Sequence, residues 1–339
     1  MLAGKQSWVF SNRPAIVSTG VSGGPFEANG KLAEDFDILH EDLWMGKDSY
    51  EKAHSLLLEE AIEAALKKRN MQKDKIQFLL AGDLINQITP TSFAARTMQI
   101  PYLGMFGACS TSMEGLALAS FIVNYGGAEY VITGASSHNA AVEKQFRYPT
   151  EYGGQKPPTA QWTVTGAGVG LVTPNTKQQE PVPVTTSATI GKVVDMGLTD
   201  PFNMGGAMAP AAADTIAAHF RDLQLEPSHY DLIVTGDLGK IGQETTYELL
   251  MKSGLEIKRE QFQDCGLMIY KEDQPVQSGG SGAGCSATVF YGHLYNQMKS
   301  GKYRRILLVA TGALLSPLSY QQNETIPCIA HAVSIEMQV

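Results

Sequence analysis

The sequence contains few cysteines, and those it has stand far apart. No two of them form a CxxC pair, and none lies in a cluster with histidine, so we expect no sequence-encoded metal site and no disulfide framework. Reduced thiols in a cytosol-like compartment are the simplest account. The four cysteines of the 339-residue chain are Cys109, Cys265, Cys285 and Cys328.

Long apolar runs and excess positive charge are also missing. No stretch approaches the ~18 apolar residues of a membrane span, and the N-terminus, MLAGKQSWVFSNRPAIV, lacks the apolar core and cleavage-like end of a signal peptide. Lys and Arg number 26 against 34 Asp and Glu, a formal net charge of -8. Nucleic acid and bare anionic membranes attract basic surfaces, so we expect neither as the main partner. A small anion would need a local positive site.

The remaining composition is that of a large globular α/β protein. Hydrophobic residues make up 43% of the chain, and the length favours two intimately joined halves. Apolar runs alternate with helical patterns, which predicts a largely parallel, helix-covered sheet. The predicted helices cover residues 49–69, the stretches from 91 and from 109, 210–223 and 282–301. The predicted strands cover residues 76–83, 129–136, a strand pair or bulged strand in 162–174, 188–194, 230–239, 304–315 and 328–339.

Similar strand, loop and helix-start segments occur in the same order in both parts of the chain, which predicts a duplication. Three segments of the first half have ordered counterparts in the second: FLLAGDL and LIVTGDL, GACSTSMEGLALA and GAGCSATVFYGHL, YVITGAS and LLVATGA. We place the two halves at residues 1–178 and 179–339. Packed around a pseudo-twofold axis, they would bring equivalent loops and helix N-termini into one cleft.

Cys109 follows Gly107 and Ala108 where a small-residue loop gives way to a helical pattern. A helix N-terminus favours a thiolate, so this position suits a nucleophile. Free cysteines are also among the most buried residues, so Cys109 equally fits a small core residue. Position alone leaves both interpretations open.

The GACST segment and the segment DPFNMGGAMAPAAADTI, residues 200–216, resemble the thiolase superfamily, which includes the β-ketoacyl synthases. The resemblance implies a five-layered αβαβα fold built from two duplicated βαβαβαββ halves. It also implies that Cys109 occupies the nucleophile position of that superfamily.

Over essentially its whole length, the chain further resembles a family of sporulation proteins from spore-forming bacteria. This resemblance implies binding of dipicolinic acid (pyridine-2,6-dicarboxylate) or its calcium chelate, for uptake into the developing spore. Any calcium would arrive with the ligand, and no other cofactor is implied. It further implies a homodimer, working peripherally at the forespore inner membrane through membrane-embedded proteins of the same uptake system.

Catalytic members of the superfamily place histidine or asparagine in two loops of the second half. Here these loops read TGDLGKIG and VQSGGSGAGCS, with Asp237 in one and a glycine near Gly279 in the other. An aspartate is a poor base for a thiol, and its charge opposes a thiolate. We therefore expect a non-catalytic binding protein in which Cys109 is a vestigial nucleophile. An active acyltransferase or condensing enzyme using Cys109 is the main alternative, and a structural scaffold is the third.

The candidate ligand residues, with Cys109 among them, are expected to gather at the predicted cleft. Asp83 and Asp237 occupy equivalent places in the two GDL segments, as turn caps or as groups facing the cleft. The other candidates share a place near a strand end or helix start: His138 after YVITGAS, Asn86 beside Asp83, Lys240 beside Asp237, and the glycines of a carboxylate-binding nest, Gly279, Gly280 and Gly282.

Overall fold

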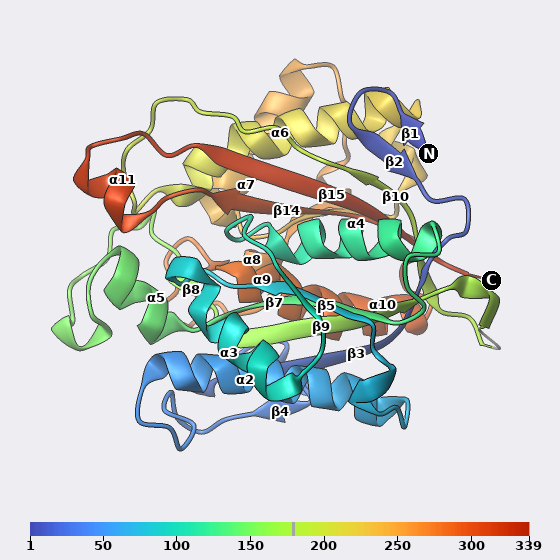
Figure 1. Cartoon of the computed structure of the whole chain (residues 1–339). Coiled ribbons are helices and arrows are strands. Elements are labelled where there is room, and N and C mark those ends of the chain that lie inside the picture. Colours follow the sequence, from blue (N-terminus) through green and yellow to red (C-terminus); the bar gives the residue numbers. More distant parts are fainter. Residues whose placement is uncertain (178–179, 339) are drawn as a thin grey trace.

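The computed structural model describes residues 1–177 and 180–338, and its first half alternates strands and helices around one mixed sheet (Figure 1). The main elements are β3 (Ala15–Gly23), α2 (Tyr50–Lys68), β5 (Phe78–Gly82), α3 (Thr89–Met98), β6 (Tyr102–Gly104), α4 (Thr111–Asn124), β7 (Val131–Ser137) and β9 (Gly166–Thr173). The strand order is β6-β5-β7-β9-β3. The first three strands are parallel, and β9 is antiparallel to both β7 and β3.

The second half repeats this arrangement. Its main elements are β10 (Pro183–Thr189), α6 (Met204–Leu223), β11 (Leu232–Thr235), α7 (Gly239–Lys252), β12 (Phe262–Asp264), α9 (Ala283–Thr288), a π-helical turn (Val289–Leu294), α10 (Tyr295–Lys299), β14 (Arg305–Ala313) and β15 (Cys328–Met337). The order β12-β11-β14-β15-β10 has the same parallel and antiparallel pairings, strand for strand.

Short elements fill the connections. They are β1 (Leu2–Ala3), β2 (Ser7–Val9), α1 (Pro25–Ala28), β4 (Ile38–Leu39), α5 (Asn139–Phe146), β8 (Trp162–Thr163), α8 (Cys265–Met268), β13 (Gly280–Ser281) and α11 (Pro317–Gln321). The two large sheets join where Val184 of β10 pairs with Ala15 of β3. The predicted boundary between the halves, at 178 and 179, falls on positions outside the described residues.

The elements form five layers. Helix α2 packs on β3 and β9, and α6 packs on β14 and β15, so these helices cover the outer faces of the two sheets. Helix α4 contacts strands of both sheets, and α9 lies beside it in the middle layer, as Figure 1 shows for α4. Ser112 Oγ and Ser286 Oγ, 2.6 Å apart, join these two central helices. This αβαβα arrangement of repeated halves confirms the expected fold.

The strands of the two sheets show little alternation between apolar and polar residues. All residues of β3, β7 and β9 are buried, because helices cover both faces. Continuous small and apolar runs such as VITGASS satisfy this requirement better than alternating ones. The predicted strands at 76–83, 129–136 and 304–315, and the described part of the one at 328–339, are confirmed as β5, β7, β14 and β15.

Three local predictions differ from the structure. Strand β10 ends at Thr189, so the expected strand at 188–194 is placed too late; Pro183 opens the strand instead. Segment 162–174 forms β8 and β9, and these pair with β13 and with β3 and β7, never with each other. Helix α6 begins before Pro210, which lies inside it.

A buried carboxyl group, that of Glu27 in α1, connects the two halves. Its Oε1 accepts hydrogen bonds from Thr165 N, at 3.1 Å, and from the Tyr270 hydroxyl of the second half. Within the described residues, Oε2 has no hydrogen-bond partner. Burial raises the pKa of Glu27 to about 7, against the smaller lowering effect of these hydrogen bonds.

Glu27→Gln should therefore stabilise the protein at neutral pH and above. The folded state holds the Glu27 proton up to about pH 7, whereas the unfolded chain releases it near pH 4.5, so the native side chain loses stability as pH rises through this window. The variant should be roughly 2–3 kcal/mol more stable at about pH 8 and nearly neutral at about pH 5. Urea unfolding of both chains at both pH values measures this difference. Equal destabilisation at both would contradict it.

Candidate functional site

Cys109 lies on the tight turn that leads from β6 into α4. Ala108, just before it, has a left-handed φ of 52°, and the helix itself begins at Thr111. A strained turn before a helix is a common way to present one side chain to a pocket. The Cys109 side chain is 8% exposed, whereas the other three cysteines are fully buried.

The Cys109 thiol lies against the Asp237 carboxyl group of the second half. Asp237 Oδ2 accepts from Gly282 N at 2.9 Å and Oδ1 accepts from Thr311 Oγ1 at 2.8 Å, while the thiol is a further hydrogen-bond partner. Burial raises the pKa of Asp237 to about 7. Burial first, and then the charge and hydrogen bond of Asp237, raise the pKa of the Cys109 thiol well above its ordinary value. The arrangement disfavours a thiolate.

A narrow pocket opens beside the thiol. Cys109 and Thr163 line it with Arg147, Ser281 and Ala313, and its volume is about 30 Å³. This is on the order of one or two water molecules. The space at Cys109 itself does not accommodate an aromatic ring.

A wider pocket of about 630 Å³ adjoins the narrow one and shares Arg147 with it. Its volume is typical of small-molecule sites. Cationic and aromatic side chains meet there: Lys156 Nζ lies 5.2 Å from the centre of the Trp162 ring, and the ring of Trp162 stacks on Phe26 at 4.3 Å. Tyr148 and Tyr152 contribute further rings to the wall.

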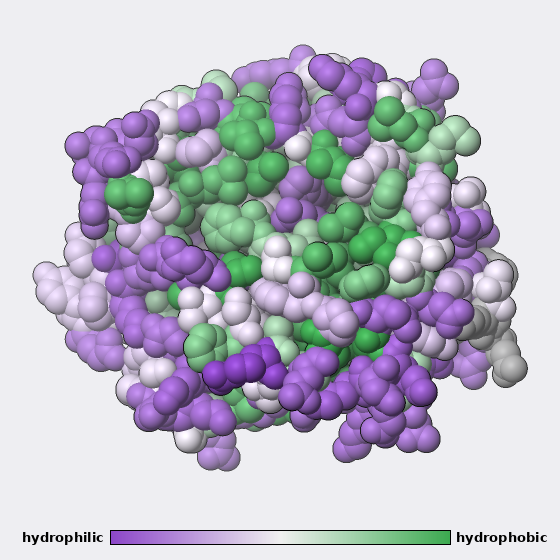
Figure 2. Space-filling model, in the orientation of Figure 1, coloured by the Kyte–Doolittle hydropathy of each residue, from purple (hydrophilic) through white to green (hydrophobic). Residues whose placement is uncertain are grey.

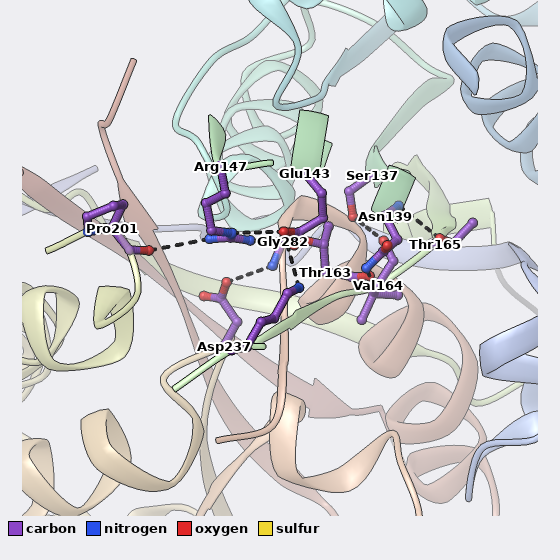
Figure 3. A network of polar contacts seen from close by, with 11 residues as sticks. Ser137, Asn139, Glu143, Arg147, Thr163, Val164, Thr165, Pro201, Asp237 and Gly282 are labelled. Atoms are coloured by element: carbon purple, nitrogen blue, oxygen red, sulfur yellow. Dashed lines mark hydrogen bonds and ion pairs between the residues drawn. The ribbon is translucent and has the colours of Figure 1, made fainter. Parts of the chain in front are cut away.

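A buried ion pair on α5 holds Arg147 in place between the two pockets (Figure 3). Arg147 Nη2 donates to Glu143 Oε1 at 2.6 Å and Nε donates to Oε2 at 3.0 Å, a bidentate contact. Lys156 Nζ lies 3.1 Å from Glu143 Oε2, and Arg147 Nη1 also donates to the Pro201 carbonyl at 3.4 Å. The side chains of Arg147 and Glu143 are 7% and 3% exposed.

Charge balance around Glu143 leaves the site positive. Burial raises the pKa of Glu143, but Arg147 and Lys156 together outweigh this and keep the pKa below its ordinary value. Burial lowers the pKa of Lys156, and Glu143 offsets part of that. One carboxylate thus faces two cations, and the excess charge suits an anionic ligand.

The sequence did not single out Glu143, Arg147, Lys156 or Trp162. The Glu143 and Arg147 spacing of four residues was visible, but such pairs are ordinary on exposed helices. Only the fold shows that α5 is packed so that this pair is buried.

Asp83 and Asn86 are not brought to the pocket. Asp83 is buried and caps its own turn, with Oδ1 accepting from Ile85 N at 2.7 Å and Oδ2 accepting from Thr91 N at 2.9 Å. Asn86 is exposed, and its N–H donates to Gln145 Oε1. The turn-cap interpretation of Asp83 fits this geometry, and the cleft-facing one does not.

His138 also turns away from both pockets. Its Nδ1 accepts from Ala141 N as the N-cap of α5, and its Nε2 bonds the Leu43 carbonyl at 2.8 Å. Burial lowers its pKa to about 4. Both ring nitrogens are engaged within the fold, and His138 lines neither pocket, so a ligand-binding role for it stays a prediction.

The glycine-rich run is engaged in internal bonds. Gly279 and Gly282 have positive φ, as the sharp turns require, and Gly280 belongs to β13. The Gly282 N–H is donated to Asp237 and the Gly284 N–H to Ser137 Oγ, so these two are not free for a carboxylate. Ser281 reaches the pocket wall instead.

Lys240 lies exposed at the start of α7, where its backbone N–H donates to the Ser278 carbonyl at 2.8 Å. It does not line either pocket. Across residues 1–177 and 180–338, no group of three or more His, Cys, Asp and Glu side chains could hold a metal ion. In the same ranges, no helix combines the length and apolarity needed to cross a membrane.

Comparison with solved structures places this geometry in the thiolase-like fold class. The chain is similar to 3-oxoacyl-[acyl-carrier-protein] synthase III from Aquifex aeolicus, with a TM-score of 0.58, 13% identity and coverage of 95% of this chain and 99% of that one. It is also similar to cerulenin-bound OleA from Xanthomonas campestris, with a TM-score of 0.63, 13% identity and coverage of 97% and 100%.

Within that class, the chain belongs to the Stage V sporulation protein AD (SpoVAD) family. The family model matches residues 4–336. The Stage V sporulation protein AD of Bacillus subtilis (strain 168) is 50% identical over 336 residues, 99% of this chain and 98% of that protein. The expected sporulation family is confirmed.

Asp237→Asn should make Cys109 more reactive toward iodoacetamide. The substitution removes the negative charge that, after burial, most raises the pKa of the thiol, and a larger thiolate fraction reacts faster. We expect slow alkylation of the native protein at about pH 8 and at least about a tenfold faster rate in the variant. Mass spectrometry of the modified peptide measures it.

Cys109→Ala serves as the control that assigns the signal, because the other three thiols are fully buried. Circular dichroism of Asp237→Asn checks that the fold is retained. Fast alkylation of the native thiol would show that Asp237 does not suppress the thiolate.

Proposed function

We propose that this protein is a non-catalytic binding protein for dipicolinate or its calcium chelate, and that the ligand occupies the wide pocket between Arg147, Lys156 and Trp162. Membership of the SpoVAD family and the pairing of cations with aromatic rings support this proposal. The observation that supports the proposal most directly is the bidentate Arg147–Glu143 pair, which holds a guanidinium group at the junction of the two pockets.

The ligand's chemistry matches these side chains group by group. A carboxylate of dipicolinate accepts hydrogen bonds from Arg147 or Lys156, because guanidinium and ammonium groups are charged donors. The pyridine ring stacks on Trp162, whose ring is partly exposed to the pocket. The narrow pocket at Cys109 then lies beyond the ligand and holds only water.

Calcium enters as part of the ligand in this proposal. The pyridine nitrogen and the two carboxylates already chelate the ion, and Ca²⁺ completes its shell with further oxygens. The proposal needs no resident cofactor. The protein would deliver its ligand to membrane-embedded proteins of the same uptake system, which carry it into the developing spore.

The side chain opposite the thiol supports the non-catalytic part of this proposal. Acyl transfer needs a base or a cation that holds the thiolate, and Asp237 acts against it. The second candidate is an acyltransferase, favoured by the turn that presents Cys109 as a nucleophile would be. Incubation with acyl-CoA separates the two, because a stable acyl adduct on Cys109 would support the enzyme.

Titration calorimetry with pyridine-2,6-dicarboxylate, with and without equimolar Ca²⁺, tests the ligand. We expect saturable binding, much weaker binding of phthalate, and at least about a tenfold loss of affinity in Lys156→Gln, which removes one charged partner. Lys144→Gln is the matched control: Lys144 lies on the neighbouring face of α5 and pairs with Glu51 outside the pocket.

Two outcomes would overturn the proposal. Absence of saturable heat with either form of the ligand would leave the scaffold or the acyltransferase. Equal effects of Lys156→Gln and Lys144→Gln would place the ligand elsewhere.

We also propose that the protein is a homodimer, joined along the edge strand β6. Leu103 on this edge is 45% exposed, and Phe93 and Phe106 nearby are 48% and 50% exposed. Figure 2 shows apolar side chains gathered around a hollow on the face that α4 crosses. An open strand edge beside apolar surface is normally covered.

Leu103→Arg should convert the dimer to a monomer, because it places a charge in the centre of the apolar edge. We expect the native chain to have the mass of a dimer in size-exclusion light scattering and the variant to dissociate at the same concentration. Leu318→Arg is the control, since Leu318 in α11 is also exposed, at 64%, but lies on another element. A monomeric native chain would refute the dimer.

A further inference from the structure

Three arginines converge on a pocket at the end of the molecule opposite the ligand site. Arg13, Arg304 and Arg305 line a cavity of about 340 Å³ with Glu336, Met337 and Gln338. The pocket lies where β14 begins and β15 ends. The chain carries a net charge of -8, so such a concentration of cations at one place is not a property of its average surface.

The backbone fixes this arrangement. Asp231 Oδ2 accepts hydrogen bonds from the backbone N–H groups of Arg304 and Arg305, at 2.6 and 2.8 Å. Arg305 lies opposite Glu336 in the β14–β15 register, and Met337 N donates to the Arg304 carbonyl. The two guanidinium groups are therefore carried by a doubly anchored strand end.

The acidic groups near the arginine pocket do not neutralise all of its positive charge. Glu336 Oε2 pairs with Arg13 Nη2 at 2.6 Å, and its Oε1 lies 3.5 Å from His229 Nε2. Arg305 Nη1 donates to the His229 carbonyl at 3.2 Å. Within the described part of the chain, the Arg304 guanidinium has no side-chain partner, and it is exposed.

Two lysines add to the same end. Lys299 Nζ donates to the Pro181 carbonyl at 3.2 Å, and Val182 beside it accepts from Gln338 N of the pocket wall. Lys302 lies over the ring of Tyr303, two residues before Arg305. Of the described acidic residues, Glu336 is already paired, Asp231 bonds the backbone as described above, and Glu180 precedes Pro181 in the sequence.

A cluster of aromatic side chains, Tyr125, Phe121 and Trp8, borders the arginine pocket. Asn12, next to Arg13, is bound to Asn124 at the end of α4 by two hydrogen bonds of 2.9 and 2.7 Å. Tyr125 follows directly and is 56% exposed; its ring packs on Phe121, which packs on Trp8. Figure 1 shows that the end of α4, the N-terminus and the end of β15 lie on this side of the molecule.

We propose that this end docks on an anionic lipid surface, with the phosphate of one lipid held in the arginine pocket and Tyr125 at the interface. Guanidinium groups bind phosphate oxygens in a fork, and tyrosine is favoured at the boundary between water and lipid. The overall acidity of the chain argues against general attraction to such a surface, and the local cluster reverses this at one end. The inference is independent of the dipicolinate proposal.

The geometry also sets the orientation. Strand β14 runs from Arg305 in this pocket to Ala313 in the wall of the narrow pocket at Cys109. At about 3.4 Å per residue, its length is roughly 27 Å. The narrow pocket, which adjoins the ligand pocket, therefore lies at the far end of β14 from the docked arginines.

Co-sedimentation with vesicles of phosphatidylglycerol and phosphatidylcholine in equal parts tests the docking. We expect binding to these vesicles, none to pure phosphatidylcholine, and loss of binding at high salt, because exposed charges are screened. Arg304→Gln should lower the partition coefficient about fivefold and the double variant Arg304→Gln, Arg305→Gln roughly 25-fold.

Lys47→Gln with Lys52→Gln is the control of matched charge, because Lys47 precedes α2 and Lys52 lies in its first turn, beside another pocket. Its binding to vesicles should equal that of the native chain. Equal loss in the control would reduce the effect to net charge and overturn the site, as would native binding that the arginine variants leave unchanged.

Glycerol 3-phosphate in solution distinguishes a lipid from a free phosphate. We expect it to compete weakly with the vesicles, because it offers one phosphate without the surface that Tyr125 contacts. Saturable binding of glycerol 3-phosphate that depends on Arg304, without any vesicle binding, would overturn the lipid assignment. Calorimetry of the double variant with dipicolinate should match the native chain, which separates this result from failure of the ligand proposal.

Discussion

The buried carboxyl group of Asp237 is the contact on which the centre of this molecule depends. It lies at the end of β11 and holds the Gly282 turn before α9, Thr311 of β14 and the Cys109 thiol of the other half. One side chain thus ties the second half's strand ends to the first half's central helix. Because it is buried, the group also decides the chemistry at the thiol.

The residue at this position therefore influences the ionisation of the Cys109 thiol. A base or cation at this place would hold a thiolate, whereas a carboxyl group with a raised pKa shares the site's protons and keeps sulfur protonated. The turn places Cys109 in the wall of the narrow pocket, and the groups around it disfavour its thiolate. The strong polar chemistry lies instead around Glu143, one pocket further out.

Buried ionisable groups are frequent in this protein. The carboxyl groups and the histidines among them change the stability of the fold in opposite directions as pH rises. Burial raises the pKa values of Glu27, Asp83 and Asp237 and lowers those of His138 and His219. Below about pH 6.5 the histidines favour folding as pH rises, and the carboxyl groups disfavour it. The effects of the histidines and of the carboxyl groups on stability largely cancel in that pH range. The contribution of one carboxyl group is therefore best measured above that range or in a single variant.

The sequence by itself determined the duplication, the order of strands and helices, and the position of Cys109 on a turn before a helix. These follow from local signals: continuous apolar runs, repeated GDL segments and a small-residue loop, each of which is read within a few residues. The turn cap formed by Asp83 was likewise predictable from residues close to it in the sequence.

The tertiary structure alone decided which polar groups face a pocket. His138 and the glycines of 279–284 stand at the expected strand and helix ends, but their donors and acceptors are used within the fold. Arg147 and Lys156 meet Trp162 across segments that no periodicity links, and the arginine pocket joins positions 13 and 305, nearly three hundred residues apart. Burial and pairing are properties of packing between distant segments, so no local pattern in the chain encodes them.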